Sequence, residues 1–590
     1  MKRKWIFLYV IIMIACSLPI MNHFLIRGHD IYFHLMRIEG LAEGLRCGQF
    51  PVRIQPVWYG DFGYAVSVFY GDLFVYFAAI LRLLGFSLQN AYKGYLLLCN
   101  AATVCIAGYS FGKIFKNAYV GVFGSALYSL AVYRLVNLYT RGALGEYTGM
   151  AFLPLILYAC TLLLDKERKK ENLKKGSFLL GIGMAFILQS HILTAELTVL
   201  MLCGVVLLFA KRVFRKEVLL NGLRAVLIAV GLSLWFLVPF GDYMLNGSYQ
   251  INAAESEEPL IQRVGIFFSQ IFPLFDNAVG ESLDLSAGPQ GDFAQGVGLG
   301  LFLALPAIVI LTAFLNKKLY QESEWRIAIA AALFGGAAVC CSTIYFPWDF
   351  LCRISSVLNY VIVNIQFPWR FTGIAAVCLT LLWCALVVLI GRHMGRKQAL
   401  AASITVVLLM SLSAGHYVID LLERGQRIQV RTQSDMDSYV ASGEEYLPLG
   451  TEPEELTPES LLQEEGLEIT QYQKNGSNVQ FYCRNHTDET KILELPLLYY
   501  DGYEAYGVSE TGKKSDINVT AGNNNAVRLL IEPDMKAEVF VHFKEPWYWR
   551  LSEVISLMSV LLLASGVRNS SNSSAQRFAL AANLVRKRSG

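Results

Sequence analysis

Long apolar runs recur along the chain and are separated by shorter polar stretches. A run of about 20 apolar residues is long enough to cross the hydrocarbon core of a membrane as a helix, and the pattern predicts about twelve such helices. We place them at residues 5–26, 91–112, 119–139, 147–164, 176–191, 193–210, 218–240, 296–315, 327–345, 370–391, 399–419 and 549–567.

Positive charge alternates between the loops that join these runs. Lys2, Arg3 and Lys4 precede the first run, which extends to about Ile26 and is long enough to be an uncleaved helix instead of a signal peptide. Cytoplasmic loops are enriched in Lys and Arg, so the alternation predicts a multi-pass protein of the cytoplasmic membrane with both termini inside. The basic stretches lie at residues 113–116, 166–175, 211–216, 317–318, 392–397 and 586–588.

Composition agrees with a chain that largely faces lipid. Hydrophobic residues make up 54% of the 590 residues, and charged residues only 16%. Soluble domains carry about 25% charged residues. The net charge of +3 is too small to indicate nucleic acid as a partner. The twelve cysteines show neither a CxxC motif nor Cys/His spacing typical of zinc sites.

The segment before the last apolar run has a different composition. It gains Glu, Asn, Ser and Thr, and the stretches 467–472 and 537–543 alternate between apolar and polar residues as strands do. We therefore expect an extracytoplasmic antiparallel β domain, similar to a sandwich, at residues 420–547. The predicted organisation is a transmembrane module (1–419) with a large first external loop (27–90), the β domain, a last transmembrane helix (548–567) and a basic cytoplasmic tail (568–590).

The first external segment carries the most informative polar pattern. Asp30 follows the first predicted span, and Asp30, His34 and Arg37 have the i, i+4, i+7 spacing of one helix face. A carboxylate there could accept a proton from a hydroxyl group or bind a divalent cation. The alternative is a helix-capping Asp30 and a salt-bridging Arg37. The nearby stretches 49–53 and 70–73 are expected to form amphipathic surface helices.

Four further polar residues fall on the same predicted side of the membrane. Arg141 and Glu146 occupy a short turn, His191 interrupts an apolar hairpin, and Arg370 follows Pro368 at the start of a span. Ionisable groups at membrane level are costly unless they are paired or used, so each has a structural alternative: an Arg141–Glu146 pair, or an interfacial Arg370. Their common side favours a reaction on a phosphate-bearing lipid over a transport path.

Several motifs together resemble a known superfamily. The stretch GHDIYFHLMRIEG resembles the acidic loop of oligosaccharyltransferase-type GT-C glycosyltransferases. The series GQFPVRI, FYGDLF, RGALGEY, QFPWRF, YLPL and YYDGYEAY resembles the bacterial YfhO-like proteins, whose relatives carry the label "6-pyruvoyl-tetrahydropterin synthase related". The resemblance implies a GT-C-like helical fold with an external β domain, and an enzyme that uses polyprenyl-phosphate-linked sugars.

Residue roles follow from this resemblance. It implies that Asp30 is the catalytic base or orients the acceptor, that Arg141 and Arg370 contact phosphate, and that Glu146 and His191 line the pocket. His34 and Arg37 join them as candidate substrate-binding residues. Many members have paired acids where this chain has Asp30 alone. The resemblance therefore predicts no definite cofactor, and a divalent cation stays compatible with the site.

The leading hypothesis is sugar transfer from a polyprenyl-phosphate-linked donor to a cell-envelope acceptor, such as a cell-surface glycan or teichoic acid, at the outer face of the membrane. Two alternatives remain. One is a transporter or flippase of lipid-linked sugars, which predicts a polar path through the membrane. The other is a non-catalytic envelope-assembly protein that binds through its β domain.

Overall fold

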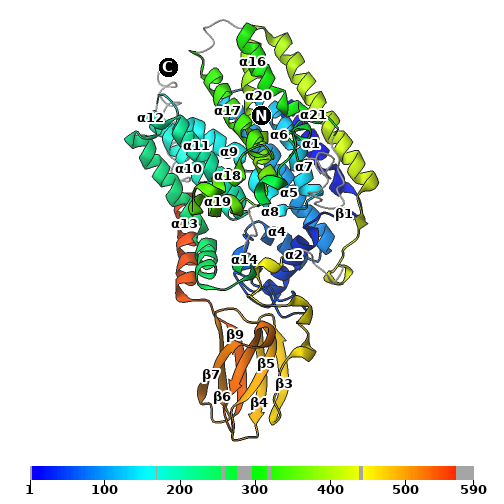
Figure 1. The fold of residues 1–590 in the computed structure, drawn as a ribbon, viewed down its shortest axis with the longest axis vertical. Helices are drawn as coiled ribbons and strands as arrows, with labels where there is room; N and C mark the ends of the chain where they lie inside the picture. Colours follow the sequence, from blue (N-terminus) through cyan, green and yellow to red (C-terminus); the bar gives the residue numbers. More distant parts are fainter. Residues whose placement is uncertain are drawn as a thin grey trace, which may run out of the picture.

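The computed structural model describes residues 3–167, 169–253, 260–275, 295–314, 321–436 and 443–565. A large helical module stands above a smaller β domain, and α2, α4 and α14 lie between the two (Figure 1). The predicted tail 568–590 and the basic pair 317–318 lie outside the described residues. The mostly helical architecture with a C-terminal sheet domain confirms the predicted fold class.

Eight helices of the described chain are long and apolar enough to cross a membrane. They are Arg3–Met21 (α1 and the 3-10 turn after it), Leu88–Ile114 (α5), Leu144–Leu163 (α8 and α9), Lys216–Asn246 (α13), Ser323–Cys341 (α17), Pro368–His393 (a 3-10 turn and α20), Arg396–Arg424 (α21) and Trp547–Ser565. A ninth crossing is formed if α6 (Ala118–Ser129) and α7 (Val132–Tyr139), which are bent by 47°, act as one span.

The predicted count of twelve goes beyond these nine. The three other predicted spans fall on α10 (Lys170–Leu188), α11 (Ile192–Leu208) and the pair α15 (Leu299–Phe302) and α16 (Ala304–Phe314). The helix α11 and the stretch Leu299–Phe314 are apolar but shorter than a full crossing. Twelve crossings therefore stay a prediction. The shorter helices are α12 (Ala210–Val213), α14 (Gln250–Ala253), α18 (Trp348–Ile354) and α19 (Ser356–Asn364).

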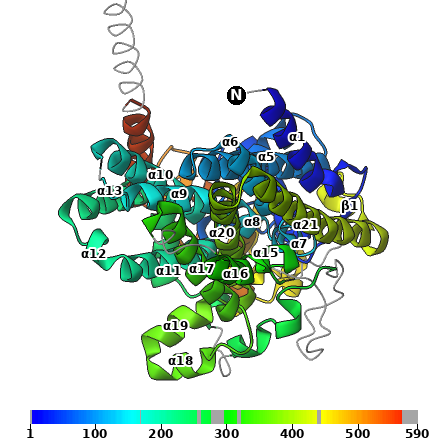
Figure 2. The same ribbon diagram turned by 90° about the horizontal axis from the view of Figure 1, so that it is seen from above.

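The helix α20 forms the centre of the helical module. Viewed from above, it is surrounded by α6, α9, α17 and α21 (Figure 2). In the most apolar stretch of this span, 89% of the residues are buried, against 33% in α17 and 33% in α21. The helices α17 and α21 therefore leave much of their surface exposed. A helix that is apolar all round and has protein on every side is fixed by packing. This fixes the position of Arg370 at its start.

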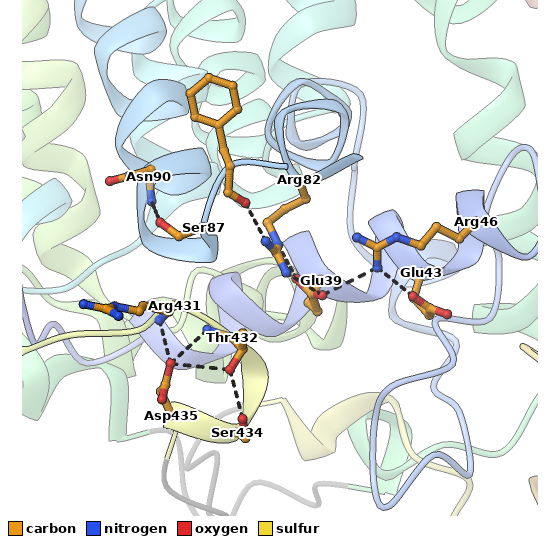
Figure 3. A network of polar contacts seen from close by, with 11 residues as sticks. Glu39, Glu43, Arg46, Arg82, Ser87, Asn90, Arg431, Thr432, Ser434 and Asp435 are labelled. Atoms are coloured by element: carbon orange, nitrogen blue, oxygen red, sulfur yellow. Dashed lines mark hydrogen bonds and ion pairs between the residues drawn. The ribbon is translucent and has the colours of Figure 1, made fainter. Parts of the chain in front are cut away.

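The segment between α1 and α5 folds against the module instead of lying loosely on its surface. It contains α2 (Ile31–Arg46), α3 (Val66–Phe69) and α4 (Val75–Leu83). Figure 3 shows Arg82 of α4 donating two hydrogen bonds, of 2.6 and 2.9 Å, to the carboxylate of Glu39 in α2. The expected surface helices at residues 49–53 and 70–73 are wrong: both stretches are irregular and mostly buried or half-buried.

Seven strands form the β domain in the order β3-β4-β9-β6-β7-β8-β5, and every pair is antiparallel. The first half of β7 pairs with β6 and its second half with β8, so the sheet folds back on itself. Apolar residues of β4 and β9 pack against those of β5 and β8 in one core, as in a sandwich. The bounds are Leu467–Asn475 (β3), Asn478–Asn485 (β4), Lys491–Leu498 (β5), Tyr503–Ser509 (β6), Lys514–Ala521 (β7), Ala526–Ile531 (β8) and Lys536–Phe543 (β9).

An apolar cluster joins the β domain to the helical module. It combines Trp58 and Phe62 of the first segment, Tyr243 of α13, Tyr500 of the sheet domain and Trp549 of the last helix. The Tyr243 hydroxyl donates a hydrogen bond of 2.7 Å to the backbone oxygen of Asp501. A further two-stranded pair, β1 (Leu25–Ile26) with β2 (Arg427–Ile428), ties the end of the first span to the chain after α21.

Candidate active site

A cavity of about 750 Å³ opens where the helical module meets the segments nearest the β domain. Parts of the chain that are far apart in sequence form its wall. They are residues 29–34 around the start of α2, 69–71 after α3, 141–143 before α8, 191–196 at the start of α11, 240–251 around the end of α13, 360–370 before α20, and 443–446. Of the seven predicted site residues, Asp30, His34, Arg141, His191 and Arg370 line this cavity.

Backbone pairing places Asp30 beside Arg141. The Asp30 amide donates a hydrogen bond of 2.8 Å to the Arg141 carbonyl, and the His29 amide donates one of 3.1 Å to the Thr140 carbonyl. Gly142 makes this approach possible, because its φ of +69° and its contact with the backbone of Ile31 leave little room for a side chain. These two hydrogen bonds hold the start of α2 beside the turn that precedes α8, although the two segments are distant in sequence.

The Asp30 carboxylate has no hydrogen-bond partner among the residues that the structure describes. Asp30 stands at the N-cap position of α2, yet its side chain does not cap the helix. The capping alternative is therefore not what the structure shows. Burial raises the pKa of Asp30 above its usual value, although the Arg141 guanidinium opposes that rise. An unpaired carboxylate with a raised pKa is suited to accept a proton.

Glu146 lies directly behind the cavity wall and forms ion pairs with both Arg141 and Arg370. Its Oε2 atom lies 2.9 Å from Arg141 Nη1 and 3.4 Å from Arg370 Nε. Its Oε1 atom accepts a hydrogen bond of 2.7 Å from the hydroxyl of Tyr133. The predicted Arg141–Glu146 pair therefore exists, but one carboxylate serves two guanidinium groups. Glu146, Arg141 and Arg370 together carry one positive charge, which lies close to the acidic side chains Asp30, Glu196 and Glu445 of the cavity wall.

Arg370 is oriented by the turn that precedes α20. Its Nη1 atom donates hydrogen bonds of 2.9 Å to the Ile365 carbonyl and to Gln366 Oε1. Gln366 has a φ of +62°, which is unfavourable for a residue other than glycine and is typical of functional sites. No hydrogen bond within the described chain occupies Arg370 Nη2, and this residue lines the cavity. The guanidinium can therefore donate to a bound anion.

Arg37 does not share the cavity with Asp30. Asp30 precedes α2, and Arg37 points away to form an ion pair with Asp72 and a hydrogen bond of 2.9 Å to the Gly71 carbonyl. Both charged side chains of this pair are almost completely buried. The expectation that Asp30, His34 and Arg37 face one common space is wrong for Arg37, because its guanidinium finds a carboxylate in the loop before α4.

The two histidines line the cavity without adding charge to it. His34 lies 3.2 Å from Arg37 Nη1 and 3.2 Å from the Leu144 backbone nitrogen. Burial and the nearby guanidinium hold the pKa of His34 well below its usual range, so the imidazole is neutral. His191 caps α11 by accepting a hydrogen bond from the Thr194 amide. His191 Nε2 could hydrogen-bond to a substrate hydroxyl group, whereas both ring nitrogens of His34 already contact protein donors.

The structure adds wall residues that the sequence analysis missed. Tyr70 places its ring 4.1 Å from the Arg37 guanidinium, and Tyr446 stacks on Phe69 at 4.8 Å. Glu445 and Tyr446 come from the connection between α21 and the β domain. Tyr70 and Tyr446 belong to the FYGDLF and YLPL motifs, but the motifs alone assigned these residues no role, because only the folding of the chain over the cavity places them in its wall.

A resident metal ion does not fit the described residues. No group of three or more His, Cys, Asp or Glu side chains gathers there in the manner of a metal site. Asp30 stands next to guanidinium groups, and Glu146 is already bound by two of them.

The buried Arg37–Asp72 pair predicts a large loss of stability when it is broken. Replacing Arg37 with Ala leaves the Asp72 carboxylate buried without its cation, which costs about 3–5 kcal/mol. SDS-induced unfolding in mixed micelles measures this change. Arg46→Ala is the matched control, since Arg46 belongs to the same helix but pairs with Glu43 at the surface. A surface pair contributes about 0–1 kcal/mol. Equal losses in both variants would contradict the assigned role of Arg37.

Comparison with known proteins identifies one related family and several solved structures. Residues 68–279 match a family model described as "6-pyruvoyl-tetrahydropterin synthase related domain; membrane protein". An uncharacterized protein of Lactococcus lactis subsp. cremoris (strain MG1363) is 20% identical over 608 residues, with 94% of each chain covered. The family match confirms the resemblance that the motifs predicted.

Solved structures similar to this chain include an archaeal oligosaccharyltransferase and ArnT bound to undecaprenyl phosphate. The Archaeoglobus fulgidus oligosaccharyltransferase in its apo form is 12% identical with a TM-score of 0.42, over 71% of this chain and 56% of that one. ArnT from Cupriavidus metallidurans bound to undecaprenyl phosphate is 13% identical with a TM-score of 0.35, over 71% and 78%. The chain thus spans little more than half of the archaeal enzyme, at 56%. This chain is a membrane protein that resembles the 6-pyruvoyl-tetrahydropterin synthase related membrane proteins over residues 68–279.

Proposed function

We propose that this protein is a membrane glycosyltransferase that transfers a sugar from a polyprenyl-phosphate-linked donor to a cell-envelope acceptor. The cavity around Asp30 is the active site in this proposal. It opens at the outer face of the cytoplasmic membrane, and both termini lie in the cytoplasm. The acceptor is a cell-surface glycan or a teichoic-acid-like polymer that offers a hydroxyl group.

One observation carries the proposal: an unpaired carboxylate and an incompletely bonded guanidinium face the same cavity. Asp30 has no hydrogen-bond partner in the described chain, and Arg370 Nη2 has none either. A base for a hydroxyl group and a donor for a phosphate are the two groups that transfer from a phosphosugar needs.

These residues account for the proton and the charge that the proposed transfer step moves. The acceptor oxygen forms a bond to the anomeric carbon of the sugar and gives its proton to Asp30. The bond between the anomeric carbon and the phosphate oxygen breaks, and polyprenyl phosphate leaves with the electron pair. Arg370 and Arg141 stabilise the negative charge that grows on the phosphate, because Glu146 neutralises only one of the two guanidinium groups.

The apolar part of the cavity wall suits the lipid part of such a donor. Phe240, Met244 and Ile251 line the cavity on one side, and Tyr360 lines it from α19. Tyr360 and Val357 of α19 are 70% and 69% exposed. An exposed apolar helix beside a polar cavity at membrane level offers a surface for an isoprenoid chain.

A transfer assay tests this function. Purified full-length protein in detergent is incubated with a panel of polyprenyl-phosphate-linked sugars and envelope glycan acceptors, and labelled product is detected by mass spectrometry. We expect product from at least one donor and release of free polyprenyl phosphate in equal amount. Movement of an intact donor across proteoliposomes without release of the sugar would contradict the proposal and favour a transporter.

A further inference from the structure

A second cavity lies on the β domain and is separate from the candidate active site. It has a volume of about 1060 Å³ and is lined only by residues of the β domain, from strands β3, β4, β9, β6 and β7. It occupies the solvent-facing side of the sheet, because the opposite side of the same strands forms the apolar core. Its size is that of a site for a ligand of several sugar units.

Two aromatic rings lie on this solvent-facing side, where the core does not require them. Tyr506 of β6 is the direct cross-strand partner of Phe540 of β9. Their rings are 5.2 Å apart with planes inclined by 21°, and both side chains are half-buried. His542 adds a third ring, 5.8 Å from Tyr506. Tyr506 and Phe540 stack on each other and His542 stands edge-on to Tyr506, at 78°, so the three rings form an apolar cluster within a polar groove.

The rest of the groove is polar but carries balanced charge. Lys514 and Lys544 are offset by Glu504 and Asp516, and Lys544 pairs directly with Glu504 at 3.0 Å. The remaining polar groups are mostly side-chain amides, which both donate and accept hydrogen bonds. These amides belong to Gln473, Asn475, Asn478, Gln480 and Asn518. Such a lining matches hydroxyl groups better than it matches a polyanion or a polycation.

Lys514 covers the Tyr506 ring in the structure. Its Nζ atom lies 3.5 Å from the ring centroid, while the lysine side chain itself is exposed. An exposed cation–π contact contributes only about 0.5–1 kcal/mol. Lys514 can therefore move aside at small cost when a ligand stacks on the ring.

We propose that this groove binds an uncharged glycan strand. The apolar C–H faces of the sugar rings stack on Tyr506 and Phe540, and their hydroxyl groups bond to the surrounding amides. The assignment goes beyond sugar transfer and does not depend on it, because none of the groove residues lines the cavity around Asp30. It gives the β domain a role in holding envelope glycan next to the membrane.

Binding of short oligosaccharides to the full-length protein in detergent tests the proposal. The probes are fluorescently labelled uncharged oligosaccharides of glucose, galactose and N-acetylglucosamine, with heparin as the anionic comparison. We expect binding of at least one uncharged probe and slower hydrogen–deuterium exchange in β6 and β9 of the wild-type protein. Absence of binding to every uncharged probe, or binding of heparin alone, would overturn the proposal.

Matched variants locate the bound glycan. Tyr506→Thr keeps the β propensity of the position but removes the ring, and should weaken binding about tenfold or more. Tyr482→Thr is the control, since Tyr482 belongs to β4 of the same sheet but does not line the groove. Lys514→Ala uncovers the Tyr506 ring and should leave binding equal or tighter. Equal weakening by Tyr506→Thr and Tyr482→Thr, or exchange protection outside β6 and β9, would overturn the proposed position.

Discussion

Replacing Asp30 with Asn is expected to abolish sugar transfer while leaving the protein folded. The amide fills the same space but cannot accept the proton of the acceptor hydroxyl, so the turnover rate should fall about 10²- to 10⁴-fold. The donor that the wild-type protein uses in the transfer assay serves as substrate. Initial rates measured at saturating donor report the effect.

Stability should not fall in this variant, and the sign follows from the pKa of Asp30. Burial raises that pKa in the folded state above its value in the unfolded chain, so the charged carboxylate opposes folding once the pH exceeds the unfolded pKa. A neutral Asn removes that penalty. Asp61→Asn is the matched control, because Asp61 is exposed in the same segment, and Asn also tolerates its φ of +69°. Full activity of Asp30→Asn would defeat the assignment of the base.

Replacing Arg370 with Lys should lower turnover about 10²-fold although the positive charge is kept. A lysine has no planar fork, so it cannot bond to the Ile365 carbonyl and Gln366 while still facing a phosphate. The negative charge on the phosphate grows as the bond to the sugar breaks. The turnover rate should therefore fall more than the KM for the donor rises.

The same helix supplies a control for this substitution. Arg392 lies at the other end of α20 and pairs with Glu322 and Glu324 near the surface, so Arg392→Lys should keep full activity. A turnover rate that is unchanged in Arg370→Lys would remove this arginine from the reaction. A similar loss in both variants would indicate a general disturbance of α20 instead of a role in phosphate stabilisation.

The proposed active site and the proposed glycan groove can be tested independently of each other. Asp30→Asn should leave binding of uncharged oligosaccharides intact, since the groove is formed by the β domain alone. Tyr506→Thr should leave transfer to a small soluble acceptor intact for the same reason. A protein that binds glycan but transfers no sugar would therefore keep the groove and lose the enzymatic proposal.

Apolar run length was sufficient to predict the helical membrane module, and strand alternation at 467–472 and 537–543 was sufficient to predict the β domain. These are local properties, because a membrane-spanning helix satisfies its own backbone hydrogen bonds and a strand shows its buried face every second residue. The polar residues at the ends of the spans also stood out locally, since charge there is costly without a use.

Only the tertiary structure decided which of those polar residues pair with each other and which face the cavity. Arg37 and Arg141 look alike in sequence, yet one is bound by Asp72 while the other meets Glu146 and the cavity. Tyr446 belongs to the YLPL motif, yet only the folding of its connection over the cavity places it in the cavity wall. Pairing of charges and the closing of a cavity depend on contacts between distant segments, and such contacts are set by the packing of the whole module and not by any pattern within one helix.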